Sequence, residues 1–225
     1  MSVERAIRIP IESHATVLGD LCLPEAASGL VIFAHGSGSG RRSPRNRSVA
    51  EALNNAGFAT LLIDLLEEDE DVEAGDSGHP KWDIEMLSKR LAHTREWTAD
   101  DPELASLPVG YFGASTGAGA ALAAAAREPD VIGAVVSRGG RPDLAGDQLR
   151  SVRAPTLLIV GSRDAHVLDL NREAANKMKA EVRLTVVPNA THLFPEPGAL
   201  EQVMELAVEW FRTHLRTEDR EASHR

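Results

Sequence analysis

A five-residue segment, Gly113-Ala114-Ser115-Thr116-Gly117, has the residue types and spacing of a nucleophile site. It matches G-x-S-x-G, in which a serine on a tight turn between a strand and a helix attacks the substrate. The apolar run 109–112 precedes the segment and an alanine-rich stretch follows it, so the required strand, turn and helix are expected in order. Glycine at both ends would admit the strained backbone of such a turn. The segment therefore predicts Ser115 as a nucleophile.

The alternative interpretation of this segment is a glycine-rich connection or a phosphate-binding turn. The spacing G-x-x-x-x-G-K-[ST] is not matched, no lysine follows, and G-x-G-x-x-G is also missing here. These mismatches favour the nucleophile.

A serine hydroxyl is a weak nucleophile near neutral pH, so it needs a neighbouring general base. Among the eight histidines, His192 follows the last apolar run and precedes the last helical stretch. Loops at that end of an open parallel sheet converge on the site. Six of the other seven histidines fit an edge hairpin, a strand end or exposed positions: His14, His35, His79, His93, His166 and His214. We therefore predict His192 as the base.

The acid that orients this base is expected between the serine and the histidine, because G-x-S-x-G hydrolases have the chain order Ser, Asp or Glu, His. Asp164 lies directly after the apolar run 156–160, at the same end of the sheet. It would accept the second ring N–H of His192, fix the tautomer and stabilise the imidazolium. Asp169 is a rival, but it falls inside the next predicted helix.

A glycine-rich loop, His35-Gly36-Ser37-Gly38-Ser39-Gly40, ends the first long apolar run. Acyl transfer needs N–H groups that stabilise the negative oxygen of a tetrahedral intermediate. The residue after the nucleophile, Thr116, should supply one N–H, and this loop the other. We predict Ser37 as the second donor, with Gly36 and Gly38 as alternates. A flexible loop or a phosphate cradle is the alternative interpretation.

The arrangement of apolar and amphipathic segments predicts the elements that hold these residues. Strands are expected in the apolar runs 30–36, 58–66, 109–112, 131–137, 156–160 and 182–187, and the run 30–36 fits a strand buried on both faces. Helices are expected at 46–55, 82–97, 168–179, after 116 and around 200–211. This alternation predicts a mostly parallel sheet with helices on both faces. Two leading strands, 6–11 and 16–23, predict an antiparallel edge hairpin. We expect one domain over 1–225, with a frayed tail at 217–225.

Composition limits the classes of partner. The chain has 225 residues, 26% of them charged, and a formal net charge of −10, which argues against nucleic acid. The charged N-terminus does not resemble a signal peptide and no apolar run approaches about 20 residues, so we expect a cytoplasmic protein without a membrane partner. Its single cysteine, Cys22, excludes an internal disulfide framework.

Although the net charge of the chain is negative, several of its arginines are notable. Arg41, Arg42, Arg45 and Arg47 make a local basic cluster, which we interpret as a solvated loop rather than a binding surface. Arg138 ends the fourth long apolar run, on the side where the site should lie. It could pair bidentately with a substrate carboxylate, or it could be a structural ion-pair residue.

The motifs HGSGSG, GASTG, GSRD and THLF occur in this order, and with them nearly the whole chain resembles the dienelactone hydrolase-like branch of the α/β-hydrolases. The resemblance implies an eight-stranded sheet flanked by helices. It also implies hydrolysis of an ester or lactone through an acyl-enzyme, without a metal or other cofactor. Dienelactone hydrolases proper use a cysteine where this chain has Ser115, which favours a serine carboxylesterase. The segment SRGGRPDLAG also looks like the hydrolase portions of certain phosphoribosyltransferase fusions.

The stretch from Ser137 to Pro155 is short and leaves little room for a helical lid. We therefore expect esters of small to moderate size as substrates, and the oligomeric state stays open. A peptidase or thioesterase acting through the same three residues is an alternative, because all acyl transfer uses these groups. A non-catalytic binding protein that retains the fold is a further alternative.

Overall fold

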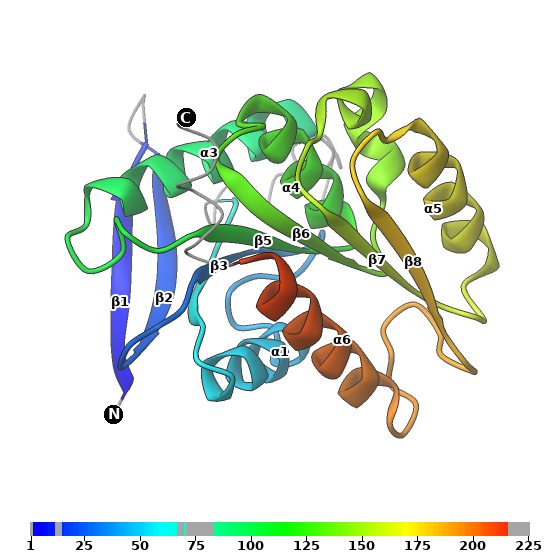
Figure 1. Ribbon diagram of the computed structural model, residues 1–225, viewed down its shortest axis with the longest axis horizontal. Coiled ribbons are helices and arrows are strands. Elements are labelled where there is room, and N and C mark those ends of the chain that lie inside the picture. The colour runs from blue at the N-terminus through cyan, green and yellow to red at the C-terminus, as the bar shows by residue number, and fades with distance from the viewer. Residues whose placement is uncertain (1, 12–14, 67–69, 71–82, 216–225) are drawn as a thin grey trace.

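The structure, a computed structural model, describes residues 2–11, 15–66, 70 and 83–215. Within these residues eight strands form one sheet in the order β1-β2-β4-β3-β5-β6-β7-β8 (Figure 1). The strands are β1 (Ser2–Pro10), β2 (Thr16–Pro24), β3 (Leu30–Ala34), β4 (Ala59–Ile63), β5 (Val109–Ala114), β6 (Ile132–Arg138), β7 (Thr156–Gly161) and β8 (Val182–Val187). β2 pairs antiparallel with β1 and β4, and all other neighbouring strands are parallel. The predicted mostly parallel sheet with an antiparallel edge hairpin is confirmed.

Helices cover both faces of this sheet, as predicted (Figure 1). α1 (Pro44–Asn55) and α6 (Ala199–His214) pack on one face. α3 (Ile84–Asp100), α4 (Thr116–Arg127) and α5 (Ala165–Lys177) lie on the other. The central strands are buried on both sides, which explains why their sequences are continuous apolar runs.

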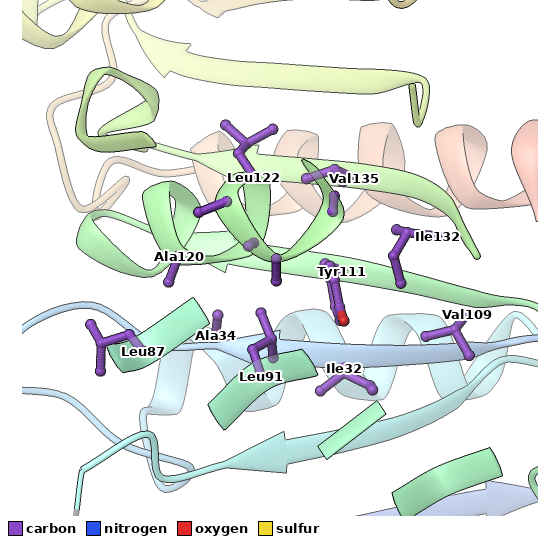
Figure 2. Packing of buried hydrophobic residues seen from close by; sticks show 14 of the residues in the cluster. Ile32, Ala34, Leu87, Leu91, Val109, Tyr111, Ala120, Leu122, Ile132 and Val135 are labelled. Carbon is purple, nitrogen blue, oxygen red and sulfur yellow. The ribbon is translucent and has the colours of Figure 1, made fainter. Parts of the chain in front are cut away.

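Alternate residues of each central strand enter two separate cores. Ile32, Tyr111 and Val135 point to the face covered by α3 and α4, where they meet Leu91 and Leu122 (Figure 2). Their neighbours Phe33, Phe112 and Val136 enter the core under α1 and α6, and the rings of Phe33 and Phe112 lie 4.8 Å apart. This alternation fixes the strand register and therefore the height at which each strand ends.

Several boundaries differ from the expected ones. α1 begins at Pro44, because proline is well suited to the first turn of a helix. α5 begins at Ala165, three residues before the expected start, so that Asp164 immediately precedes it. The stretch 67–80, predicted to be a surface loop, lies outside the described residues apart from Glu70, which pairs with Arg90. The tail predicted at 217–225 also lies outside them.

The connection between β6 and β7 contains η3 (Pro142–Ser151), a 3₁₀ segment that the sequence analysis did not predict. η3 packs against α4 and α5, beside the sheet. No helical lid was expected here, and within the described residues none covers the strand ends. In the same part of the chain no helix has the length and apolar character that a bilayer crossing requires.

Candidate active site

Ser115 occupies the turn between β5 and α4, as the motif predicted. Its φ of 51° lies in the region that residues with a side chain rarely adopt. The turn is fastened to the end of β6, because the Ser115 N–H donates to the carbonyl of Arg138 (3.2 Å) and the Ser115 carbonyl accepts from the N–H of Arg141 (3.0 Å). A strained residue held by its neighbours in this way is typical of a functional position.

The two glycines of the motif are required by close backbone approach. A Cβ on Gly113 would lie 2.4 Å from Cα of Ala118, and a Cβ on Gly117 would lie 2.3 Å from the carbonyl oxygen of Ala34. Because Gly113 and Gly117 have no side chains, α4 can begin in direct contact with β3 and β5.

Gly117→Ala is expected to lower the free energy of unfolding by more than about 3 kcal/mol, because the added methyl group meets rigid backbone. Gly57→Ala is the matched control. Gly57 has a φ of 89° with open space around its Cβ position, so only about 1 kcal/mol of backbone strain is expected there. Urea unfolding of both variants measures the difference, and equal losses would contradict the packing argument.

Asp164 and His192 are brought together by the loops that follow β7 and β8. Nδ1 of His192 lies 2.6 Å from Oδ2 of Asp164. The Asp164 side chain is largely buried and that of His192 is about one third exposed (15% and 38%). The contact assigns the proton to Nδ1 and leaves Nε2 free to accept one. The rival Asp169 instead pairs with Arg172 on the exposed side of α5.

The two loops are joined by hydrogen bonds. Ser162 Oγ accepts from the N–H of Asn189 (2.8 Å), and the Arg163 N–H donates to the carbonyl of Ala190 (2.9 Å). Next to His192, the carboxylate of Glu196 accepts from both the hydroxyl (2.7 Å) and the N–H (3.1 Å) of Thr191. The sequence analysis missed this role of Glu196, although a carboxylate five residues after a threonine in a proline-rich loop is a recognisable signal.

Ser115 and His192 line the same cavity, which has a volume of about 980 Å³. Within the described residues no hydrogen bond joins the Ser115 hydroxyl to the imidazole. Catalytic hydrogen bonds of enzymes without substrate are often long and shorten when substrate binds. Ser115 and His192 therefore line one cavity, and a hydrogen bond between them would form when substrate binds.

The predicted oxyanion donors lie on either side of Ser115. Ser37 Oγ and Thr116 Oγ1 form a hydrogen bond of 2.9 Å, which holds the glycine-rich loop against the start of α4. A Cβ on Gly36 would lie 2.9 Å from Cβ of Ser115, so glycine is needed for this approach. Thr116 opens α4, and the first N–H groups of a helix have no partner inside it. Gly38 also lines the cavity.

His35, which directly follows β3, makes two contacts that position its ring. Its Nε2 accepts from the N–H of Leu65 (2.8 Å) and its Nδ1 lies 3.0 Å from the carbonyl oxygen of Gly36. The ring is buried and connects the end of β3 to the residues after β4. It therefore supports the start of the glycine-rich loop.

The basic cluster is partly solvated: Arg42 and Arg47 are exposed, in line with the prediction, whereas Arg41 and Arg45 are half-buried. Arg41, Arg42 and Arg45 line the cavity, while Arg47 pairs with Asp20 at 2.8 Å outside it. The sequence analysis did not foresee this cavity, which the residues around the start of α1 share because they directly follow the glycine-rich loop.

Arg138 lines the same cavity and is buried, with 6% exposure. Its Nη2 donates to the amide oxygen of Asn46 (3.2 Å), and within the described residues it forms no ion pair. Burial, together with the charge of Arg45, lowers the pKa of Arg138 to about 10. The guanidinium thus stays protonated at neutral pH.

No group of three or more His, Cys, Asp or Glu side chains within the described part of the chain is arranged to hold a metal ion. The groups gathered at the strand ends are instead a serine, a histidine, a carboxylate and backbone N–H groups, and this set can perform acyl transfer.

Comparison with known proteins places the chain in a class and then in a family. The mostly parallel eight-stranded sheet with helices on both faces has the α/β-hydrolase fold. The model of the dienelactone hydrolase family matches residues 19–215. The chain therefore belongs to the dienelactone hydrolase family.

Individual relatives agree with this membership. The chain is similar to a dienelactone hydrolase from Anabaena variabilis, with 50% identity and a TM-score of 0.92 over 96% of this chain and 99% of that one. Est1E from Butyrivibrio proteoclasticus shares the fold, with a TM-score of 0.78 at 17% identity over 92% of this chain and 98% of that one.

Two curated relatives are longer. Proteins from two strains of Mycobacterium tuberculosis, both named "Putative phosphoribosyl transferase", are 60% identical to this chain over 207 residues. The match covers 92% of this chain but 44% of theirs, so the chain spans less than half the length of these relatives.

Proposed function

We propose that this protein is a serine hydrolase that cleaves carboxylic esters or lactones of small to moderate size through an acyl-enzyme on Ser115. The single observation that carries the proposal is the 2.6 Å contact between His192 Nδ1 and Asp164 Oδ2, in a cavity that Ser115 also lines. A histidine oriented in this way, in the same cavity as a strained serine, supports general-base activation of that serine.

In the proposed reaction Ser115 Oγ bonds to the carbonyl carbon of the ester while its proton passes to Nε2 of His192. The carbonyl oxygen becomes negative and accepts hydrogen bonds from the N–H groups of Thr116 and Ser37. Collapse of this intermediate breaks the bond to the leaving alcohol, which takes the proton from Nε2. Water, deprotonated by the same nitrogen, then attacks the acyl-enzyme; the bond to Ser115 Oγ breaks, the serine oxygen takes the proton back from Nε2, and the acid is released.

The preference for compact esters rests on the short connection between β6 and β7. η3 packs beside the sheet and, within the described residues, no helix covers the cavity. A long acyl chain would gain little apolar contact there. The transferase named for the longer relatives is not part of the proposal, because the family model already accounts for residues 19–215.

A substrate panel tests the proposal. We expect kcat/KM for p-nitrophenyl acetate or butyrate to exceed that for the octanoate by at least about tenfold. We also expect the butyrate ester to be hydrolysed faster than butyryl-CoA and than a peptide p-nitroanilide. Preference for the thioester or the anilide would replace the esterase by a thioesterase or peptidase. No turnover of any member would favour a non-catalytic binding protein.

A further inference from the structure

Arg138 is the last residue of β6, the strand that pairs with β5, and the proposed nucleophile Ser115 directly follows β5. Arg138 is in register with Ala114, and its carbonyl accepts the N–H of Ser115 at 3.2 Å. Its side chain is 6% exposed and lines the cavity. Only the amide of Asn46 contacts its guanidinium, and within the described residues Nε has no hydrogen-bond partner. A buried arginine without a carboxylate is costly unless another anion pairs with it.

Arg45 brings a second cation to the same place. It lies in the first turn of α1, lines the cavity, and has a buried Nε without a partner among the described residues. Both arginines line the one cavity, and the positive charge of Arg45 adds to the burial that lowers the pKa of Arg138. Repulsion between two positive charges is relieved by a group with more than one negative charge between them.

The N-terminus of α1 adds to this positive potential. A helix start favours anions, but the first turn of α1 contains no acidic residue and the Ser43 side chain does not cap it. Asp64 is the one carboxylate among the described residues that line the cavity, and Arg41 already pairs with it. Among the described residues, therefore, no carboxylate pairs with Arg138 or Arg45.

We propose that Arg138 and Arg45, at the N-terminus of α1, form a subsite for a doubly charged phosphate group on the substrate, next to Ser115. A carboxylate carries one charge and is satisfied by one bidentate arginine. A phosphate monoester offers nearly two charges and three oxygens, which matches two guanidinium groups and a helix start. The inference rests on the proposed function, since it names the class of ester that the same site would take.

Three p-nitrophenyl esters of similar acyl length test the subsite: the neutral butyrate, the succinate half-ester, and the 3-phosphonopropionate, which is a stable phosphate analogue. We expect kcat/KM for the phosphonate to exceed that for the butyrate by at least about tenfold and to exceed that for the carboxylate. Inorganic phosphate should inhibit hydrolysis of the butyrate competitively, at constant ionic strength.

Arg138→Gln and Arg45→Gln should each lower the ratio of phosphonate to butyrate kcat/KM by about ten- to hundredfold. Arg138→Lys should recover only part of the ratio, because lysine keeps the charge but not the planar fork. Arg47→Gln is the matched control: it changes an arginine of the same helix that pairs with Asp20 outside the cavity, and its ratio should stay unchanged. Arg45 is only half-buried, so its variant tests the subsite even if Arg138→Gln fails to fold.

Equal rates for all three esters, an equal or greater preference for the carboxylate, or ratios unaffected by both glutamine variants would each overturn the phosphate subsite and leave the esterase proposal standing. If no ester is hydrolysed, the esterase proposal fails, and calorimetry with inorganic phosphate still decides the subsite. Binding that is lost in Arg138→Gln and Arg45→Gln would support it, and no binding to the wild type would overturn it.

Discussion

Replacement of Ser115 by alanine is expected to lower kcat for p-nitrophenyl butyrate by at least about 10⁴-fold, because the acyl group then has no oxygen to which it can transfer. Since Ala has no hydroxyl but fits the same turn, the variant should keep its fold and its affinity for substrate. Initial rates at saturating ester measure the loss, and the thermal unfolding midpoint of the variant checks that it is folded.

Ser28→Ala is the control for this variant. Ser28 precedes β3 at the opposite end of the strand from the cavity, where its hydroxyl donates to the carbonyl of Gly57 (3.3 Å). Its removal should leave kcat unchanged. If Ser115→Ala kept activity within tenfold of the wild type while Ser28→Ala behaved normally, hydrolysis would have to proceed without a serine nucleophile at this turn.

The second large effect is expected for Asp164→Asn, with a loss of about 10³- to 10⁴-fold in kcat. The asparagine can present its NH₂ group to Nδ1 of His192 and so favour the tautomer that carries its proton on Nε2, where it cannot accept one from Ser115. Because an amide has almost the volume of a carboxylate, the loops should keep their hydrogen bonds and stability should change little.

Asp169→Asn is the matched control, since it makes the same chemical change in the acid that competes with Asp164 on the basis of sequence. Asp169 pairs with Arg172 on the surface and both side chains are mostly exposed. An exposed pair of this kind contributes little, so activity should be unchanged. A large loss in Asp169→Asn together with a small loss in Asp164→Asn would reverse the assignment of the orienting acid.

The sheet and the order of its strands could be predicted largely because the central strands are buried on both faces. Runs such as 157–160 are then apolar throughout, and glycine or a polar residue marks the end of each one. The chemistry follows from these ends: Ser115, Asp164 and His192 each come directly after a strand or in the loop beyond it. Local patterns therefore sufficed to nominate them.

The arginines could not be placed in the same way, because their environment depends on contacts between distant segments. Arg138 meets Asn46 across 92 positions of the chain, and this contact exists only when α1 packs against the end of β6. In the sequence, the residues around Arg45 have the composition of a solvated loop. The segment η3 and the start of α5 at Ala165 also depend on packing, against α4 and against the loop after β7. No periodic apolar pattern in the sequence predicts them.

The most direct test of the account is covalent labelling of the active protein with a fluorophosphonate, followed by intact-mass measurement and peptide mapping. If Ser115 is the nucleophile, one adduct per chain forms on Ser115, esterase activity falls in proportion to labelling, and Ser115→Ala takes up no adduct. An adduct on a different residue, or full inhibition without any modification of Ser115, would contradict this assignment.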